Sequence, residues 1–146
     1  MDVSKLCDLE LRYTSLETVD YEPGGQVYGT MEGSLKGERL SGTMHLTNIA
    51  ARRPDNVNVP TLRGLLTAHD GTRVWVEMDG LAMLRPADNA RVILARCGFR
   101  TSHPDLRWLN TAFVVFEGVL DQVAVGGTAR GEMHLCQATV PSPVRA

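Results

Sequence analysis

The chain has 146 residues, a mass of 16.0 kDa and a formal net charge of -2. A chain of this length forms one domain and buries a single core without disulfides or metals. The near-neutral charge gives no electrostatic reason to expect a nucleic acid or an anionic membrane as a partner. No apolar run approaches the roughly 20 residues needed to cross a bilayer, and the first residues lack the pattern of a secretory signal. We therefore expect one cytoplasmic globular domain spanning residues 1–146.

Alternating or β-branched residues predict eight strands. They occupy residues 6–18, 26–35, 38–47, 59–69, 72–82, 90–101, 111–121 and 127–140. The segments between them are rich in Gly, Pro, Asn and Asp, the residues that favour turns. The linkers KG and DG are too short for a parallel crossover, so they predict antiparallel hairpins. One helical segment of one or two turns is predicted near residues 104–110, because Pro104 suits the start of a helix.

Eight successive hairpin-connected strands predict an all-β fold, an antiparallel meander closed into a β-barrel. An open sheet would leave two unpaired edges and one uncovered apolar face, and the chain offers no long helices to cover it. A two-sheet sandwich is the alternative. We favour the barrel because the connections are too short for a Greek key. An eight-stranded barrel either fills its interior with side chains or holds one small ligand.

The hairpin RGLLTAHDGTRVWVEMDG, residues 63–80, indicates which side chains face inward. With Asp70-Gly71 as a two-residue type I′ turn, His69 pairs with Thr72, and successive residues pair outward from there. Because a shift of one residue reverses the faces of one strand relative to the other, this register is a hypothesis.

In that register Arg63 pairs with Met78. Arg63 and Thr67 then share an otherwise apolar face, whose natural place is the barrel interior. Glu77 and Asp79 lie on the solvated exterior. A cation in an apolar wall requires a partner or a ligand anion, so Arg63 becomes a candidate functional residue. The hypothesis fails if Glu77 points into the barrel instead.

Four segments in a fixed order resemble the bacterial family called Domain of Unknown Function 3237. They are GG.V.G (24–29), GERLSG (37–42), RGLLTAHDG (63–71) and FRTSHPDLRWLN (99–110), and the resemblance covers roughly residues 6–140. It implies a small lipocalin-like β-barrel that self-associates, and it implies no agreed reaction. Family members often show a Gly-Ala-Asp-Trp-like segment after the third strand, where this chain reads HLTNIAARRPDN (45–56).

Two charged residues are the candidates for catalysis. The guanidinium of Arg63 could hold a carboxylate, phenolate or enolate through its fork of donors. A structural salt bridge to Glu117 or Glu32 is the alternative for Arg63. Glu117 is the only charge in the apolar stretch FVVFEGVL, and burial there would raise its pKa toward the range useful to a general acid or base. A carboxylate on the outer wall is the alternative for Glu117.

Five residues are candidates for ligand binding. His45 and Asn48 lie where a strand enters a long loop, a position typical of the rim of a barrel mouth. Thr67 shares the predicted inner face with Arg63. Trp108 and Asn110 could close one end of the barrel, with Trp108 as an apolar plug and Asn110 bonding free backbone groups. A surface position for His45 and a purely structural role for Trp108 are the alternatives.

No cofactor or metal site is predicted. The chain contains no phosphate-binding loop, no dinucleotide fingerprint and no GxSxG motif, and its four histidines lack metal-ligand spacing. The cysteines, Cys7, Cys97 and Cys136, are far apart, odd in number and form no CxxC pair, which favours free buried thiols.

Three hypotheses about function follow. The first is a cofactor-free enzyme, such as an isomerase, cyclase or hydrolase, acting on a hydrophobic or aromatic metabolite in the barrel. The second is a non-catalytic carrier or sensor of a small hydrophobic ligand. The third is a structural barrel without a ligand. A buried carboxylate beside Arg63 would favour the enzyme, and a uniformly apolar pocket would favour the carrier.

The strand at residues 111–121 also predicts self-association. Phe113, Val115 and Val119 alternate with Val114, Phe116 and Leu120, so apolar residues would line both the lumen and the outer wall. Exposed apolar patches of this kind usually meet a partner. We expect a homo-oligomer, most simply a dimer.

Overall fold

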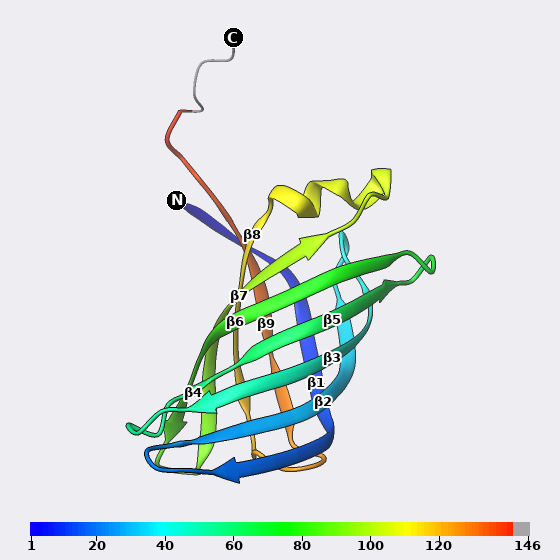
Figure 1. Ribbon diagram of the computed structural model, residues 1–146. Coiled ribbons are helices and arrows are strands. Elements are labelled where there is room, and N and C mark those ends of the chain that lie inside the picture. The colour runs from blue at the N-terminus through cyan, green and yellow to red at the C-terminus, as the bar shows by residue number, and fades with distance from the viewer. Residues whose placement is uncertain (142–146) are drawn as a thin grey trace.

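The computed structural model describes residues 1–141 and contains a closed antiparallel β-barrel (Figure 1). The strands are β1 (Asp2–Asp20), β2 (Gly25–Lys36), β3 (Gly42–Arg52), β4 (Asn58–Val59), β5 (Thr61–Ala68), β6 (Arg73–Arg85), β7 (Ala90–Arg100), β8 (Phe113–Leu120) and β9 (Thr128–Gln137). The two-residue β4 and the longer β5 replace the single predicted strand 59–69. Pro60 separates them because it has no N–H to give to a strand ladder.

Each long strand pairs with the next one along the chain, and β9 closes the ring by pairing with β1. The short β4 adds pairings to β3 and β6 at one end. The predicted eight-stranded meander and its closure into a barrel are therefore confirmed, and the sandwich is excluded. Within residues 1–141, no helix is long and apolar enough to span a membrane.

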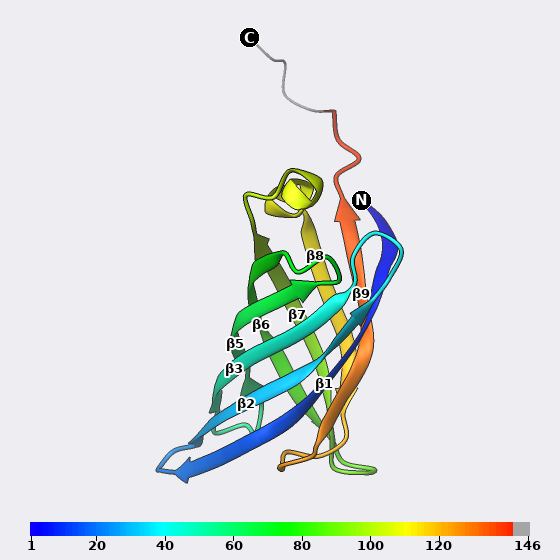
Figure 2. The same ribbon diagram turned by 90° about the vertical axis from the view of Figure 1, so that its right-hand side faces the viewer.

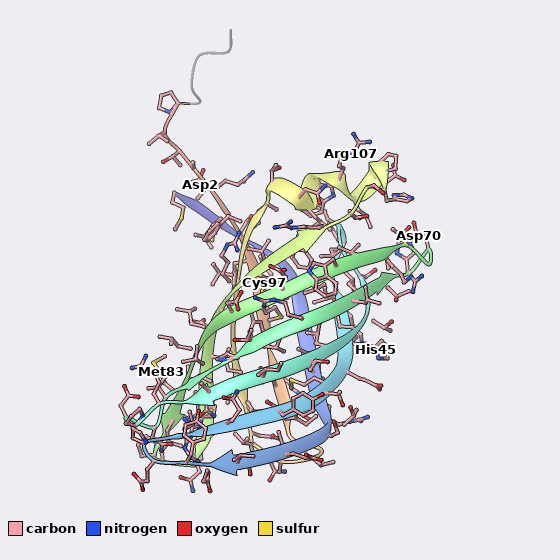
Figure 3. The ribbon with its side chains drawn as sticks, in the orientation of Figure 1. Asp2, His45, Asp70, Met83, Cys97 and Arg107 are labelled. Carbon is pink, nitrogen blue, oxygen red and sulfur yellow. The ribbon has the colours of Figure 1, made fainter. Side chains whose placement is uncertain are left out.

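The hairpin between β5 and β6 differs from the predicted register by one residue. The N–H of Gly71 donates to the carbonyl of Ala68 at 2.8 Å, and Thr72 pairs with Ala68. This is a three-residue loop, in which a type I turn is followed by Gly71 at φ +89°, a conformation that favours glycine. Asp70 lies at the tip of the hairpin (Figure 3) and does not adopt the positive φ that a type I′ turn requires.

The changed turn places Arg63 opposite Glu77 instead of Met78. The predicted inner face of β6 is correct, since Val76 and Met78 are buried. The predicted inner face of β5 is wrong. Leu62 and Leu66 point inward, while Arg63 and its neighbours of the same parity point outward.

The segment after β7 forms the 3₁₀ helix η1 (Pro104–Thr111), which lies across one end of the barrel (Figures 1 and 2). His103 caps its start, with Nδ1 accepting from the Asp105 N–H at 3.3 Å. Leu109 is the side chain that closes this end, because only 1% of it is exposed. Trp108 is half-buried beside the core and stacks on the Arg39 guanidinium, 3.9 Å from its ring centroid. The apolar plug is therefore Leu109, the residue after the predicted Trp108.

The barrel interior is packed with side chains in the half nearest η1. The buried residues of that half include Leu6, Leu35, Leu40, Met44, Leu66, Val74, Leu109, Val114 and Leu135. Cys7 and Cys97 belong to the same core, and Cys136 is partly exposed. The hollow part of the barrel must therefore lie toward the strand ends that face away from η1.

Candidate functional site

An apolar pocket occupies the half of the barrel away from η1. Its walls come from every part of the barrel: Leu11, Tyr13, Val27, Met31, Asn48, Ala50, Asn58, Pro60, Leu62, Met78, Ala82, Ile93, Ala95, Phe116, Leu120, Val123 and Ala129. Most of these are inward-facing residues of successive strands, as expected from the alternation of side chains along a strand. The cavity volume is about 50 Å³. Among the described residues of this wall, only Tyr13, Asn48 and Asn58 carry polar side-chain nitrogen or oxygen atoms.

Asn48 is the one predicted binding residue that lies in the pocket wall. It is 4% exposed. Its Nδ2 donates to the Tyr13 hydroxyl at 2.8 Å, and its Oδ1 accepts from the Thr61 N–H at 3.1 Å. Both ends of the amide are therefore occupied, which fixes its orientation and joins β1 to β3 and to the start of β5.

The two predicted catalytic residues lie on the outer wall. The Arg63 side chain is 37% exposed and forms ion pairs with Asp79 at 3.1 Å and Glu77 at 3.8 Å. Glu117 is exposed and lies opposite Leu94 and Glu132 on neighbouring strands. The one-residue shift in the register of β5 and β6 directs Arg63 outward. Glu117 has the opposite parity to the buried side chains of β8 and lies on the outer wall, as its alternative stated. Arg63 forms a structural ion pair, but with Asp79 and Glu77 instead of the expected Glu117 or Glu32.

The remaining predicted binding residues also lie away from the pocket. His45 is exposed on the outer side of β3, with Nδ1 3.3 Å from Glu32 (Figure 3). Thr67 faces outward, like Arg63. Trp108 and Asn110 belong to η1, at the filled end. Asn110 does bond free backbone groups as predicted, because its amide accepts from the Thr101 N–H and donates to the Thr101 carbonyl, both at 2.8 Å.

Sequence reasoning missed Tyr13 and Asn58. Tyr13 is 3% exposed and has the same parity as Leu9 and Leu11, so strand alternation could have identified it as inward-facing. Burial raises the pKa of its phenol, and the hydrogen bond from Asn48 acts in the opposite direction. Asn58 is 8% exposed, and its buried Oδ1 has no hydrogen-bond partner among residues 1–141. Nothing in the local sequence distinguishes Asn58 from an ordinary loop asparagine.

Arg91 lies near the same end of the barrel and is 7% exposed. It has the parity of Ile93 on β7, but its guanidinium is directed into the turn between β3 and β4. There it donates to the carbonyl and side-chain oxygens of Asn56, and to the Ala82 carbonyl at 3.4 Å. Burial and the nearby charge of Arg52 lower its pKa. Arg91 therefore holds the 53–57 turn against the barrel end.

The described part of the chain, residues 1–141, contains no group of three or more His, Cys, Asp or Glu side chains arranged to hold a metal ion. Tyr13 is the only titratable residue among the described pocket walls. The pocket can therefore bind and orient a molecule through apolar contacts and neutral hydrogen bonds.

Comparisons with known proteins define the fold and leave the function open. No protein-family model matches the chain, and no curated protein matches it. The resemblance to the Domain of Unknown Function 3237 family therefore stays a prediction.

Solved structures are similar in fold. A conserved protein of unknown function from Rhodopseudomonas palustris superposes with a TM-score of 0.78 at 17% identity, over 92% of this chain and 96% of that one. A beta-barrel like protein from Acinetobacter baumannii superposes with a TM-score of 0.76 at 14% identity, over 92% of this chain and 94% of that one. An enzyme from Penicillium herquei superposes with a TM-score of 0.63 at 16% identity, over 90% of this chain and 93% of that one. The chain thus has the fold of a small β-barrel class with bacterial and fungal members.

Proposed function

We propose that the barrel binds a small, mainly apolar molecule in the pocket at the end of the barrel away from η1. The observation that carries this proposal is a concave apolar wall that includes Asn58, whose buried Oδ1 has no hydrogen-bond donor among residues 1–141. Native proteins pair nearly all their buried polar atoms. A concave apolar wall that carries a few polar groups is typical of a ligand-binding site.

The volume of the cavity limits the size of the ligand. A cavity of about 150 Å³ takes up benzene, and this cavity measures about 50 Å³. A ring-sized ligand therefore requires wall side chains to move. Met31 and Met78 can provide this space, because the unbranched methionine side chain repacks at low cost.

A carrier or sensor agrees better with the pocket than an acid–base enzyme does. The proposed catalytic pair lies outside the barrel, and no carboxylate or imidazole belongs to the described pocket walls. An enzyme remains the second candidate because Tyr13 presents a phenol beside Asn48. Such an enzyme would act by holding its substrate in a reactive pose, with Tyr13 as a hydrogen-bond donor. The fungal structural neighbour that is called an enzyme is consistent with this alternative.

Binding is tested by NMR of the protein labelled with ¹³C at its methionine methyl groups. Phenol and toluene are the probes, and we expect the Met31 and Met78 signals to shift while Met83, on the outer wall, does not. In the variant Ala50→Leu the larger side chain fills the pocket, so the shifts should disappear. The matched control Ala51→Leu, on the opposite face of β3, should keep them. Absence of shifts with both probes in the unaltered protein would overturn the proposal.

We also propose that the barrel self-associates through its outer wall. Leu81 pairs with Leu94 across β6 and β7, and both are at least 40% exposed. Met83, Val92 and Val119 extend the same apolar surface to β8. Sedimentation velocity is expected to give a dimer that the substitution Leu94→Glu dissociates. A monomer at high protein concentration would contradict this.

A further inference from the structure

Two hydrogen bonds fix the hydrogen-bonding direction of the Tyr13 hydroxyl. The Thr61 backbone N–H can only donate, so the Asn48 atom that it contacts at 3.1 Å is the amide oxygen. The other end of the amide is then an NH₂ group, and it lies 2.8 Å from the Tyr13 oxygen. An NH₂ group can only donate to that oxygen. The Tyr13 oxygen is therefore an acceptor from Asn48, and the phenolic proton points elsewhere.

The Tyr13 proton is available inside the pocket. The side chain is 3% exposed and belongs to the pocket wall. Burial raises the pKa of the phenol, so the proton stays on the oxygen at neutral pH. Tyr13 therefore offers the pocket one hydrogen-bond donor in an otherwise apolar part of the wall.

Asn58 contributes an unpaired acceptor to the residues that line the same pocket. Asn58 is more than nine-tenths buried and lines the same pocket. Its Oδ1 has no hydrogen-bond donor among residues 1–141. A buried acceptor without a partner destabilises the folded chain. In this apolar wall, a partner from outside residues 1–141, such as a bound molecule, would satisfy it.

We propose that the ligand is a neutral molecule with a hydroxyl group, an alcohol or phenol, on an apolar body. This inference rests on the proposed binding function and specifies the ligand. A hydroxyl can both accept from the Tyr13 proton and, once the pocket wall repacks around the ligand, donate to Asn58 Oδ1, so its chemistry matches both residues. A carboxylate brings no donor for Asn58. Arg91, a buried cation among residues 1–141, donates to Asn56 and Ala82 and is not one of the lining residues of the pocket.

Three aromatic probes of similar size separate the possible ligand classes: phenol with a hydroxyl, toluene with none, and benzoate with a negative charge. Binding is followed through the methyl signals of Met31 and Met78. We expect phenol to bind about tenfold more tightly than toluene, the factor that one net hydrogen bond supplies. Benzoate should bind more weakly than phenol.

Two substitutions assign the preference to its residues. Tyr13→Phe and Asn58→Leu should each reduce the preference for phenol over toluene to about threefold or less. Tyr28→Phe is the matched control, because the Tyr28 side chain is 57% exposed on the outer wall of β2. It should leave the preference unchanged. If Tyr13→Phe fails to fold because Asn48 loses its acceptor, Asn58→Leu still decides the result.

The outcomes distinguish the two proposals. If neither phenol nor toluene shifts the pocket methionines, the binding function itself is wrong. If both bind with equal affinity, the pocket binds apolar molecules and the hydroxyl inference is wrong. A tighter complex with benzoate, or an unchanged phenol preference in Asn58→Leu, also overturns the inference.

Discussion

Replacing Asn58 by leucine should make the protein more stable. The two side chains are similar in size, and Oδ1 of Asn58 is buried without a donor among residues 1–141. A buried unpaired polar group costs about 1–3 kcal/mol, and asparagine is also disfavoured in strands. For 146 residues at about 2.1 cal/mol/K each, the unfolding entropy is about 0.31 kcal/mol/K. The gain should therefore raise Tm by roughly 3–10 °C.

The assay is thermal and urea unfolding of the ligand-free protein, with Asn48→Leu as the matched comparison. Asn48 is also buried, but both ends of its amide are bonded, so its replacement leaves the Thr61 N–H and the Tyr13 oxygen without their partner. We expect Asn48→Leu to lower the free energy of unfolding by about 1–3 kcal/mol. The reasoning is refuted if Asn58→Leu destabilises the protein as much as Asn48→Leu does.

Three further predictions concern other parts of the barrel. Arg91→Met should destabilise the fold by about 1–3 kcal/mol, because the Asn56 oxygens lose charge-assisted bonds; unchanged hydrogen exchange in the 53–57 turn would contradict this. The pKa of Asp88 is lowered to about 2, mainly by its hydrogen bonds with the Arg85 side chain. Asp88 therefore stabilises the fold above pH about 4, and this stabilisation is lost as the pH falls toward 2. Asp88→Asn should thus lower Tm at pH 7 and have a much smaller effect near pH 2, and a pH-independent difference would argue otherwise. A thiol reagent at pH 8 should modify Cys136 quickly and the two buried thiols only after unfolding, because burial raises the pKa of Cys7 to about 12; rapid reaction of all three would show that the core is open.

Strand alternation predicted the fold better than it predicted the site. The alternation in β8 correctly indicated apolar residues on both faces, and the structure directs Val114 and Phe116 inward and Phe113 outward. The prediction for Glu117 failed because a single charge in an apolar strand was interpreted as buried, although its parity matches Phe113. The same parity rule, applied to β1, places Tyr13 on the inner face.

Two site residues depend on contacts that no local pattern shows. Asn48 was predicted at the rim of the barrel mouth, and its hydrogen bonds to Tyr13 and Thr61 span 35 and 13 residues of sequence. Asn58 reaches the pocket through pairings with Arg52 and Ala82 on two other strands. Such contacts follow from barrel closure, which sets the neighbours of each strand end.

By itself the sequence determined the eight hairpin-connected strands and their antiparallel direction, since short turn segments and two-residue alternation act locally along the chain. The tertiary structure decided which face of β5 looks inward and which half of the barrel stays hollow. A turn longer by one residue turned Arg63 to the solvent. Closure of β9 on β1, together with Leu109 of η1, left the unfilled space at the opposite end. Both outcomes depend on packing between distant segments, which local propensity does not encode.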